Sequence, residues 1–128
     1  MANGLVSRQV GTYDSQMIQV TWLLTTADPI GAGCEFPEWA DQTWAVGITG
    51  DTLGGAVVSV MGGATQNDAD FYTLSNAAGS TPATFNAFGI KTTIENPRYL
   101  RPKLTTVGIG ASITVVLLMR RATGINRV

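Results

Sequence analysis

The stretch that decides the fold is SITVVLLMRR, residues 112 to 121. In an extended strand, successive side chains point to opposite faces. One face then carries Ile113, Val115, Leu117 and Met119, and the other Thr114, Val116, Leu118 and Arg120. Both faces are apolar in the middle, whereas an antiparallel strand with one wet face alternates apolar and polar residues. We therefore expect a strand covered on both sides, by a second sheet and by another subunit or loop.

The apolar segment from Leu104 to Met119 invites a membrane interpretation, with Arg120-Arg121 as its cytoplasmic anchor. A spanning helix needs about 20 mostly apolar residues. This segment is shorter, contains threonine, serine and glycine, and has a β-branched run, residues 113–116, in its final part. These features favour a strand, and we expect no membrane contact.

The rest of the chain repeats this pattern of short β-branched and aromatic runs between Gly, Asn, Asp and Pro clusters. Residues 16 to 26 predict a strand whose core face carries Ile18, Val20, Trp22 and Leu24. Residues 43–49 and 55–61 predict a hairpin across the glycine-containing connection 50–54. A second hairpin is predicted from 71–75 and 83–90. Residues 71 to 90 carry no charge, which favours packing or an interface for them.

A further strand is expected over residues 98 to 104, RYLRPKL. Proline cannot donate to a ladder, so Pro102 predicts an edge strand or a strand end, with Arg98, Arg101 and Lys103 projecting toward a partner. About seven or eight strands result. We expect one all-β domain over residues 1–128, an antiparallel two-sheet sandwich of jelly-roll or Greek-key type, with 1–15 as an extended N-terminal arm.

Composition favours assembly. Apolar residues make up 45% of the chain, but charged residues only 13%, about half the roughly 25% of ordinary soluble domains. A surface with so few charges either exposes much Gly, Ser and Thr or is covered by partner subunits. We favour cover by partners.

The charges are unevenly distributed along the chain. Residues 1–90 hold eight acids and only Arg8, whereas residues 91–128 hold seven bases and only Glu95. These opposite charges either pair within one fold or give the surface a dipole that orients head-to-tail contacts. The net charge of −1 argues against a uniformly basic nucleic-acid binder.

Residue types argue against catalysis. The chain has no histidine, which removes Ser-His-Asp and Cys-His sites and imidazole metal sites. Cys34, the single cysteine, has no basic activator nearby in sequence and is expected to be a small buried hydrophobe. The Asn67–Asp70 run could offer oxygens to Ca²⁺ but lacks the EF-hand spacing. Nothing in the spacing selects a glycosidase pair of carboxylates. We expect no enzyme, no metal and no cofactor.

The tryptophans divide into two groups. Trp22 and Trp44 lie inside apolar strands and are expected in the core, whereas Trp39 lies in the acidic, aromatic segment 34–41 and is a candidate exposed anchor. The first ten residues lack a basic segment followed by an apolar one, so we expect no secretory signal and synthesis in the cytoplasm.

The sequence FYTLSNAAGSTPATFNAFGIKTTIENPRYLRPKLTTVGIGASITVVLLMRR, residues 71 to 121, resembles head decoration or cement proteins of tailed bacteriophages. It shares with them a "TL…G…TF…GI" hairpin, an "NPRYLRP" strand, a short Gly/Thr loop and a final apolar strand ending in Arg-Arg.

The resemblance implies a β-sandwich, often trimeric, on the exterior of a capsid in the virion, where it holds neighbouring major capsid proteins together. It implies no direct contact with nucleic acid. The candidate polar anchors are Arg98, Arg101 and Lys103, and the candidate apolar anchors are Phe36, Trp39 and Tyr99. The alternative is a carbohydrate-binding or receptor-binding module of a phage tail or fibre.

Overall fold

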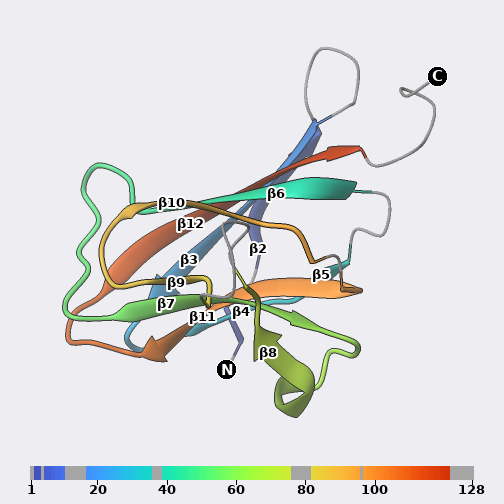
Figure 1. Cartoon of the computed structure of the whole chain (residues 1–128). Helices are drawn as coiled ribbons and strands as arrows, with labels where there is room; N and C mark the ends of the chain where they lie inside the picture. The colour runs from blue at the N-terminus through green and yellow to red at the C-terminus, as the bar shows by residue number, and fades with distance from the viewer. Residues whose placement is uncertain are drawn as a thin grey trace.

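The computed structural model describes residues 2–3, 5–10, 17–35, 39–75, 82–95 and 97–121, with side chains placed for 19–35, 42–75, 82–95 and 97–119. Two sheets pack face to face (Figure 1). One is five-stranded, in the order β10-β6-β12-β3-β2. The other is seven-stranded, in the order β1-β4-β11-β7-β8, with β5 paired to β11 and β9 to β7. All pairings are antiparallel except β1 with β4.

The strand bounds are as follows. The five-stranded sheet contains β2 (Leu5–Val10), β3 (Met17–Thr25), β6 (Trp39–Val46), β10 (Gly89–Thr93) and β12 (Ser112–Arg121). The seven-stranded sheet contains β1 (Ala2–Asn3), β4 (Ile30–Gly31), β5 (Cys34–Glu35), β7 (Val57–Gly63), β8 (Phe71–Thr73), β9 (Thr84–Phe85) and β11 (Tyr99–Thr106).

The connectivity is that of a jelly roll. If β4 and β5 count as one interrupted strand, β8 and β9 as another, and β1 and β2 are set aside, eight strands run in chain order from β3 to β12. The sheets then read 6-3-8-1 and 2-7-4-5, an eight-stranded arrangement of two Greek keys. The predicted antiparallel two-sheet sandwich is confirmed. No helix among the described residues is long and apolar enough to cross a membrane.

The core lies between the two sheets and follows the predicted alternation. On β3, Val20, Trp22 and Leu24 are fully buried, as expected; the side chain of Ile18 lies outside the described residues. Trp22 stacks on Trp44 with ring centroids 5.9 Å apart. Cys34 is also buried, as predicted. The inward positions of β12 are Ile113, Val115, Leu117 and Met119, and all four are 0% exposed.

The predicted hairpin of residues 43–49 and 55–61 is wrong. β6 pairs with β10 and β12, whereas β7 pairs with β8, β9 and β11, so the connection crosses between the sheets. The connection closes local turns, with Asp51 N–H donating to Ile48 C=O and Ala56 N–H to Leu53 C=O, both at 3.0 Å, and it is also hydrogen-bonded to β12. The Asp51 carboxylate accepts from the backbone N–H of Ile48 (2.9 Å) and of Thr114 (2.8 Å), and Thr52 exchanges two backbone bonds with Ser112.

Of the second predicted hairpin, between 71–75 and 83–90, the described residues form only one bridge and one direct backbone hydrogen bond. Ser75 and Pro82 make an isolated bridge, and Ala83 N–H donates to Leu74 C=O at 2.7 Å. The strands on either side, β8 and β9, both pair with β7. Both are antiparallel to β7 and follow one another along it, so together they act as one interrupted edge strand and do not face each other.

The prediction of an edge strand at Pro102 is also wrong, because β11 lies between β7 and the β4/β5 pair. Leu104 N–H donates to Pro29 C=O at 2.9 Å, so by strand alternation the missing donor of Pro102 faces the same neighbour. That neighbour is interrupted there: β4 ends at Gly31 and β5 begins at Cys34. Within the gap, Ala32 C=O accepts from Trp22 Nε1 at 2.9 Å. A side-chain donor thus satisfies a carbonyl in the stretch where the ladder is broken.

Gly31 makes this arrangement possible. A Cβ atom there would lie 2.8 Å from Pro102 Cδ and 2.9 Å from Pro102 O. We expect Gly31→Ala to lower the free energy of unfolding by about 2 kcal/mol, since overpacking of a tight site typically costs about 1–3 kcal/mol. Urea denaturation measures the change. The matched control is Gly89→Ala, where a Cβ would meet no atom within 4 Å; an equal loss in both variants would contradict the steric explanation.

Candidate docking surface on strand β11

The outer face of β11 gathers four of the six candidate contact residues. Leu100, Pro102 and Leu104 are buried, with Leu100 and Leu104 part of the core, so the alternate residues face away from it. Arg98 lies immediately before the strand. We call the outward residues and their ionic partners the β11 patch: Arg98, Tyr99, Arg101, Lys103, Glu35 and Asp68.

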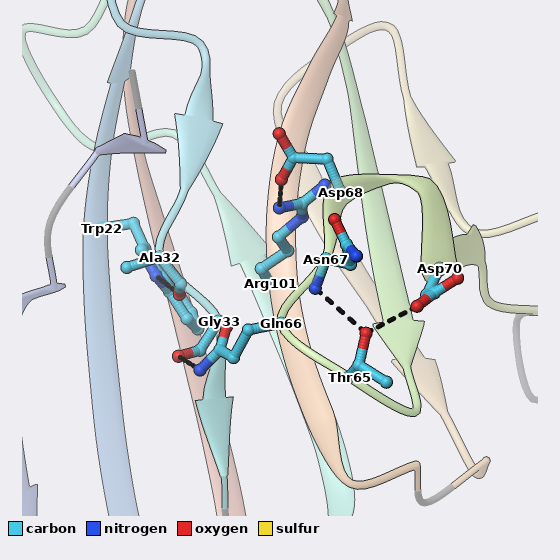
Figure 2. A network of polar contacts seen from close by, with 9 residues as sticks. All are labelled: Trp22, Ala32, Gly33, Thr65, Gln66, Asn67, Asp68, Asp70 and Arg101. Atoms are coloured by element: carbon cyan, nitrogen blue, oxygen red, sulfur yellow. Dashed lines mark hydrogen bonds and ion pairs between the residues drawn. The ribbon is translucent and has the colours of Figure 1, made fainter.

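Arg101 is the centre of the β11 patch, but it does not project into solvent. The residue is only 2% exposed, because residues 64–70 fold over the outer face of the sheet (Figure 2). Its guanidinium lies 3.8 Å from the ring centroid of Phe71, and its Nη1 donates to Asp68 Oδ1 at 2.5 Å. The prediction that Arg101 projects toward a partner is wrong, because residues 64–70 of the same chain already cover its side chain.

Burial leaves the Arg101 cation with incomplete hydrogen bonding. Its Nε and Nη2 are buried and have no hydrogen-bond partner within the described part of the chain. The charge is therefore compensated by Asp68 and by the face of the Phe71 ring. In return, the hydrogen bond and positive charge of Arg101 lower the pKa of the Asp68 carboxyl below its ordinary value.

The covering segment 64–70 is held by its own polar contacts. It ends in a short 3-10 helix, η1 (Asp68–Asp70). Thr65 Oγ1 donates to Asp70 Oδ2 at 2.6 Å and accepts from the backbone N–H of Asn67 at 3.0 Å. Gln66 Nε2 donates to Gly33 C=O at 3.3 Å, which ties the segment to the β4–β5 connection (Figure 2).

The oxygens considered for Ca²⁺ therefore have other roles here. Asp68 binds Arg101, and Asp70 accepts from Thr65. Among the residues that the structure describes, no group of three or more His, Cys, Asp or Glu side chains is placed to hold a metal ion.

Arg98 is the accessible cation of the β11 patch. Its Nε donates to Glu35 Oε2 at 2.6 Å, and the two side chains are 62% and 41% exposed. The guanidinium also lies 5.2 Å from the ring centroid of Tyr99. The hydrogen bond and charge of Glu35 raise the pKa of Arg98. Exposed ion pairs of this kind contribute little to stability, so both groups can exchange this contact for a partner at small cost.

The structure places the other candidates as follows. Lys103 is half-buried on the same face as Arg101, two residues along β11. Phe36 lies outside the described residues. Trp39 begins β6, but its side chain is likewise outside the described set. The β11 patch therefore unites Arg98, Tyr99, Arg101 and Lys103, and the apolar anchors Phe36 and Trp39 stay predictions.

The uneven charge distribution allowed two interpretations, pairing of opposite charges within one fold or a surface dipole. For the four residues of the two ion pairs, the structure decides between them. Each joins a base from the last third of the chain to an acid from the first 90 residues: Arg98 to Glu35 and Arg101 to Asp68. Pairing within one fold is confirmed for these four. No local pattern indicated Asp68 or Phe71 as partners of Arg101, because both lie far from it in the sequence, 33 residues away for Asp68.

The sequence analysis also did not predict a series of hydrogen bonds between polar side chains in the interior. Trp44 Nε1 donates to Thr93 Oγ1 at 2.9 Å, Thr93 Oγ1 donates to Gln42 Oε1 at 2.5 Å, and Gln42 Nε2 donates to Glu95 C=O at 2.6 Å. It links β6 to β10 and to the residues after it, and it lets polar side chains occupy inward positions at the edge of the core.

Comparison with known proteins gives no match: neither the scan against protein-family models nor the searches of curated proteins and of solved structures found one. The structure by itself defines the class of protein: a jelly-roll β-sandwich with a polar, ion-paired patch on the outside of one sheet.

Proposed function

We propose that this protein is a virion structural protein that decorates a phage capsid and stabilises it by bridging neighbouring major capsid proteins. The observation that carries the proposal is that the two outer faces of the sandwich are unlike. The seven-stranded sheet carries the β11 patch, with its two ion pairs. The outward residues described on β3, β6, β10 and β12 of the other sheet carry no charge.

Two unlike surfaces suit a bridging protein, which needs one surface for the shell and one for its neighbours. Arg98 and Lys103 on the β11 patch supply charges that can orient the protein on an acidic shell. Charged rim contacts contribute modestly to each interface, but many copies on a lattice add their contributions. The resemblance of residues 71–121 to decoration proteins supports the same role, with a homotrimer as the assembled form.

The test is decoration of empty expanded phage capsids by the purified protein. Co-sedimentation and electron microscopy would give the copy number, which we expect to saturate at a fixed value per capsid. Arg98→Ala and Lys103→Gln are each expected to weaken binding several-fold, with a larger effect at low salt because the contribution is electrostatic.

The matched control is Lys91→Gln, which removes the same charge from the other sheet. Lys91 Nζ donates to Thr84 C=O at 2.6 Å and lies 5.3 Å from the centroid of the Phe85 ring, away from the β11 patch. Capsid binding that is absent, or that falls equally in all three variants, contradicts the proposal. A response on a glycan array without capsid binding would favour a receptor-binding module instead.

A further inference from the structure

One edge of the Arg101 guanidinium has no acceptor in the described part of the chain. Asp68 Oδ1 accepts from Nη1, whereas Nε and Nη2 are buried and find no partner among the described residues. Nε and Nη2 lie side by side, and together they form the fork that holds both oxygens of a carboxylate. The side chain of Arg101 is only 3% exposed, so this fork is directed at neither water nor an acid of the described chain.

The buried arginine is a poor choice for stability alone. A buried cation with unpaired donors loses hydration that a single hydrogen bond does not replace. An apolar side chain of similar length would fill the same place against the Phe71 ring without that cost. Arg101 therefore suits a bound state, in which an oxyanion completes its hydrogen bonds.

The covering segment 64–70 is suited to displacement. Residues 64–69 are exposed and η1 contains no buried residue, so opening the segment takes no apolar side chain of its own out of the core. Within the described residues, its side-chain hydrogen bonds to the rest of the chain are those of Asp68 with Arg101 and of Gln66 with Gly33 (Figure 2). Segments with few buried apolar contacts and exposed hydrogen bonds open at low free energy.

We propose that Arg101 is a docking site for a carboxylate of a partner protein, and that the covering segment 64–70 moves aside to admit it. In the free chain, Asp68 is an internal competitor for the site. A carboxylate is the favoured ligand because the present occupant is one, and because the fork of Nε and Nη2 matches its two oxygens.

Lys103 adds a second positive charge to the site. It lies two residues along β11 on the same face as Arg101, and its charge also lowers the pKa of Asp68. No acid forms an ion pair with Lys103 within the described residues. Once Asp68 has moved away, two neighbouring cations face the partner, which favours an acidic segment with more than one carboxylate.

The inference deepens the proposed function and rests on it for the identity of the partner, an acidic surface of the shell. Its test uses the free chain and a synthetic peptide without capsids. A failure here therefore leaves the capsid-binding result unaffected, and the reverse.

The probe is a fluorescent hexaglutamate peptide, with hexaglutamine as the uncharged reference, and fluorescence anisotropy at low salt gives the affinity. Asp68→Asn removes the competing charge and is expected to bind hexaglutamate at least about tenfold more tightly than the wild type, from the usual strength of hydrogen bonds to charged groups. The matched control is Asp70→Asn, which removes the same charge from the same segment. Asp70 accepts from Thr65 and not from Arg101, so its affinity should change little.

Thr65→Val tests the displacement without changing a charge. It removes both hydrogen bonds of Thr65 Oγ1 inside the covering segment, so the segment opens more often and the apparent affinity rises several-fold, in proportion to the open fraction. Adding Arg101→Met to either variant should abolish the gain. Thermal unfolding followed by circular dichroism checks that each variant folds, and Thr65→Val decides the question if Asp68→Asn does not.

Modification by phenylglyoxal, which reacts with accessible guanidinium groups, measures the opening in the wild type. Mapped by mass spectrometry, Arg98 should react fast and Arg101 slowly. The rate at Arg101 should depend little on urea below the unfolding transition, because a local opening exposes little surface. Modification of Arg101 only on global unfolding would overturn the proposal, since the covering segment would then not open by itself.

The peptide results can overturn it as well. Equal gains in Asp68→Asn and Asp70→Asn, or a gain that survives Arg101→Met, would show that net charge and not Arg101 binds the peptide. Inorganic phosphate that displaces hexaglutamate at far lower concentration than acetate does would overturn the assignment to a protein carboxylate in favour of a phosphate ligand.

Discussion

Trp22→Ala is expected to lower the free energy of unfolding by about 4 kcal/mol, within the range of about 3–5 kcal/mol for truncation of a buried tryptophan. Trp22 is fully buried, stacks on Trp44 at an interplanar angle of 18°, and donates its indole N–H to Ala32 C=O. The variant loses the apolar contacts, the stack and the only side-chain donor shown for that carbonyl within the described residues. Urea denaturation followed by far-ultraviolet circular dichroism measures the loss.

Trp22→Phe separates the contributions to this effect. It keeps most of the buried ring but removes the donor to Ala32, so we expect a loss of about 1–2 kcal/mol, the cost of an unsatisfied buried group and a small void. A loss below about 1 kcal/mol for Trp22→Ala would mean that this tryptophan does not anchor the core, since buried tryptophan truncation normally costs several times more.

Asp68→Ala is expected to destabilise the protein more than Arg101→Met, although Arg101 is the buried partner. Removing Asp68 leaves a buried cation whose other nitrogens already lack partners, and uncompensated buried charges cost about 3–5 kcal/mol. The Asp68 side chain is 65% exposed, so water can partly replace it and we expect about 3 kcal/mol, at the low end of that range. Arg101→Met keeps an apolar stem against Phe71 and is expected to cost less than about 1 kcal/mol.

A double-mutant cycle tests the physical cause. Asp68→Ala combined with Arg101→Met should be about as stable as Arg101→Met alone, because the acid has no role once the buried cation is gone. Additive losses in the double variant would show that Asp68 stabilises the covering segment independently of Arg101.

The dependence of stability on pH gives a second measurement of the same pair. Arg101 lowers the pKa of Asp68 below its ordinary value of 3.8, so the charged carboxylate is the form that stabilises the fold. This contribution is complete above the unfolded pKa and is lost as the pH falls through the lower folded pKa. In acid denaturation, the wild type should therefore lose more stability below about pH 4, near the ordinary carboxyl pKa, than Arg101→Met.

The prolines and glycines show why local signals mislead in this fold. Pro102 indicated an edge strand because a proline cannot pair on one side. In the folded protein the neighbouring strand is broken at that point, between β4 and β5, and Gly31 leaves room for the ring. The connection 50–54 indicated a hairpin, yet β6 and β7 lie in different sheets, and the Asp51 carboxylate accepts from the backbone N–H of Thr114 on β12, 63 residues away. Both errors concern partners that are distant in the sequence.

For the candidate docking surface too, part could be predicted from the sequence and part depends on partners distant in the chain. The sequence predicts that Arg98, Arg101 and Lys103 project from the strand over residues 98–104, and in the structure Arg98 is exposed and Lys103 half-buried. The burial of Arg101 depends on residues 64–70 and on Phe71, which reach it only through the pairing of β7 with β8 and β11.

The amino-acid sequence by itself determined the all-β class, the inward face of β3, the division of β12 into its two faces, and the burial of Trp22, Trp44 and Cys34. These follow from the two-residue period of a strand, which is a local property. Only the tertiary structure decided which strands pair, which cations are covered and which stay accessible. Those outcomes depend on contacts between residues far apart in the chain, and many pairings are compatible with the same local alternation.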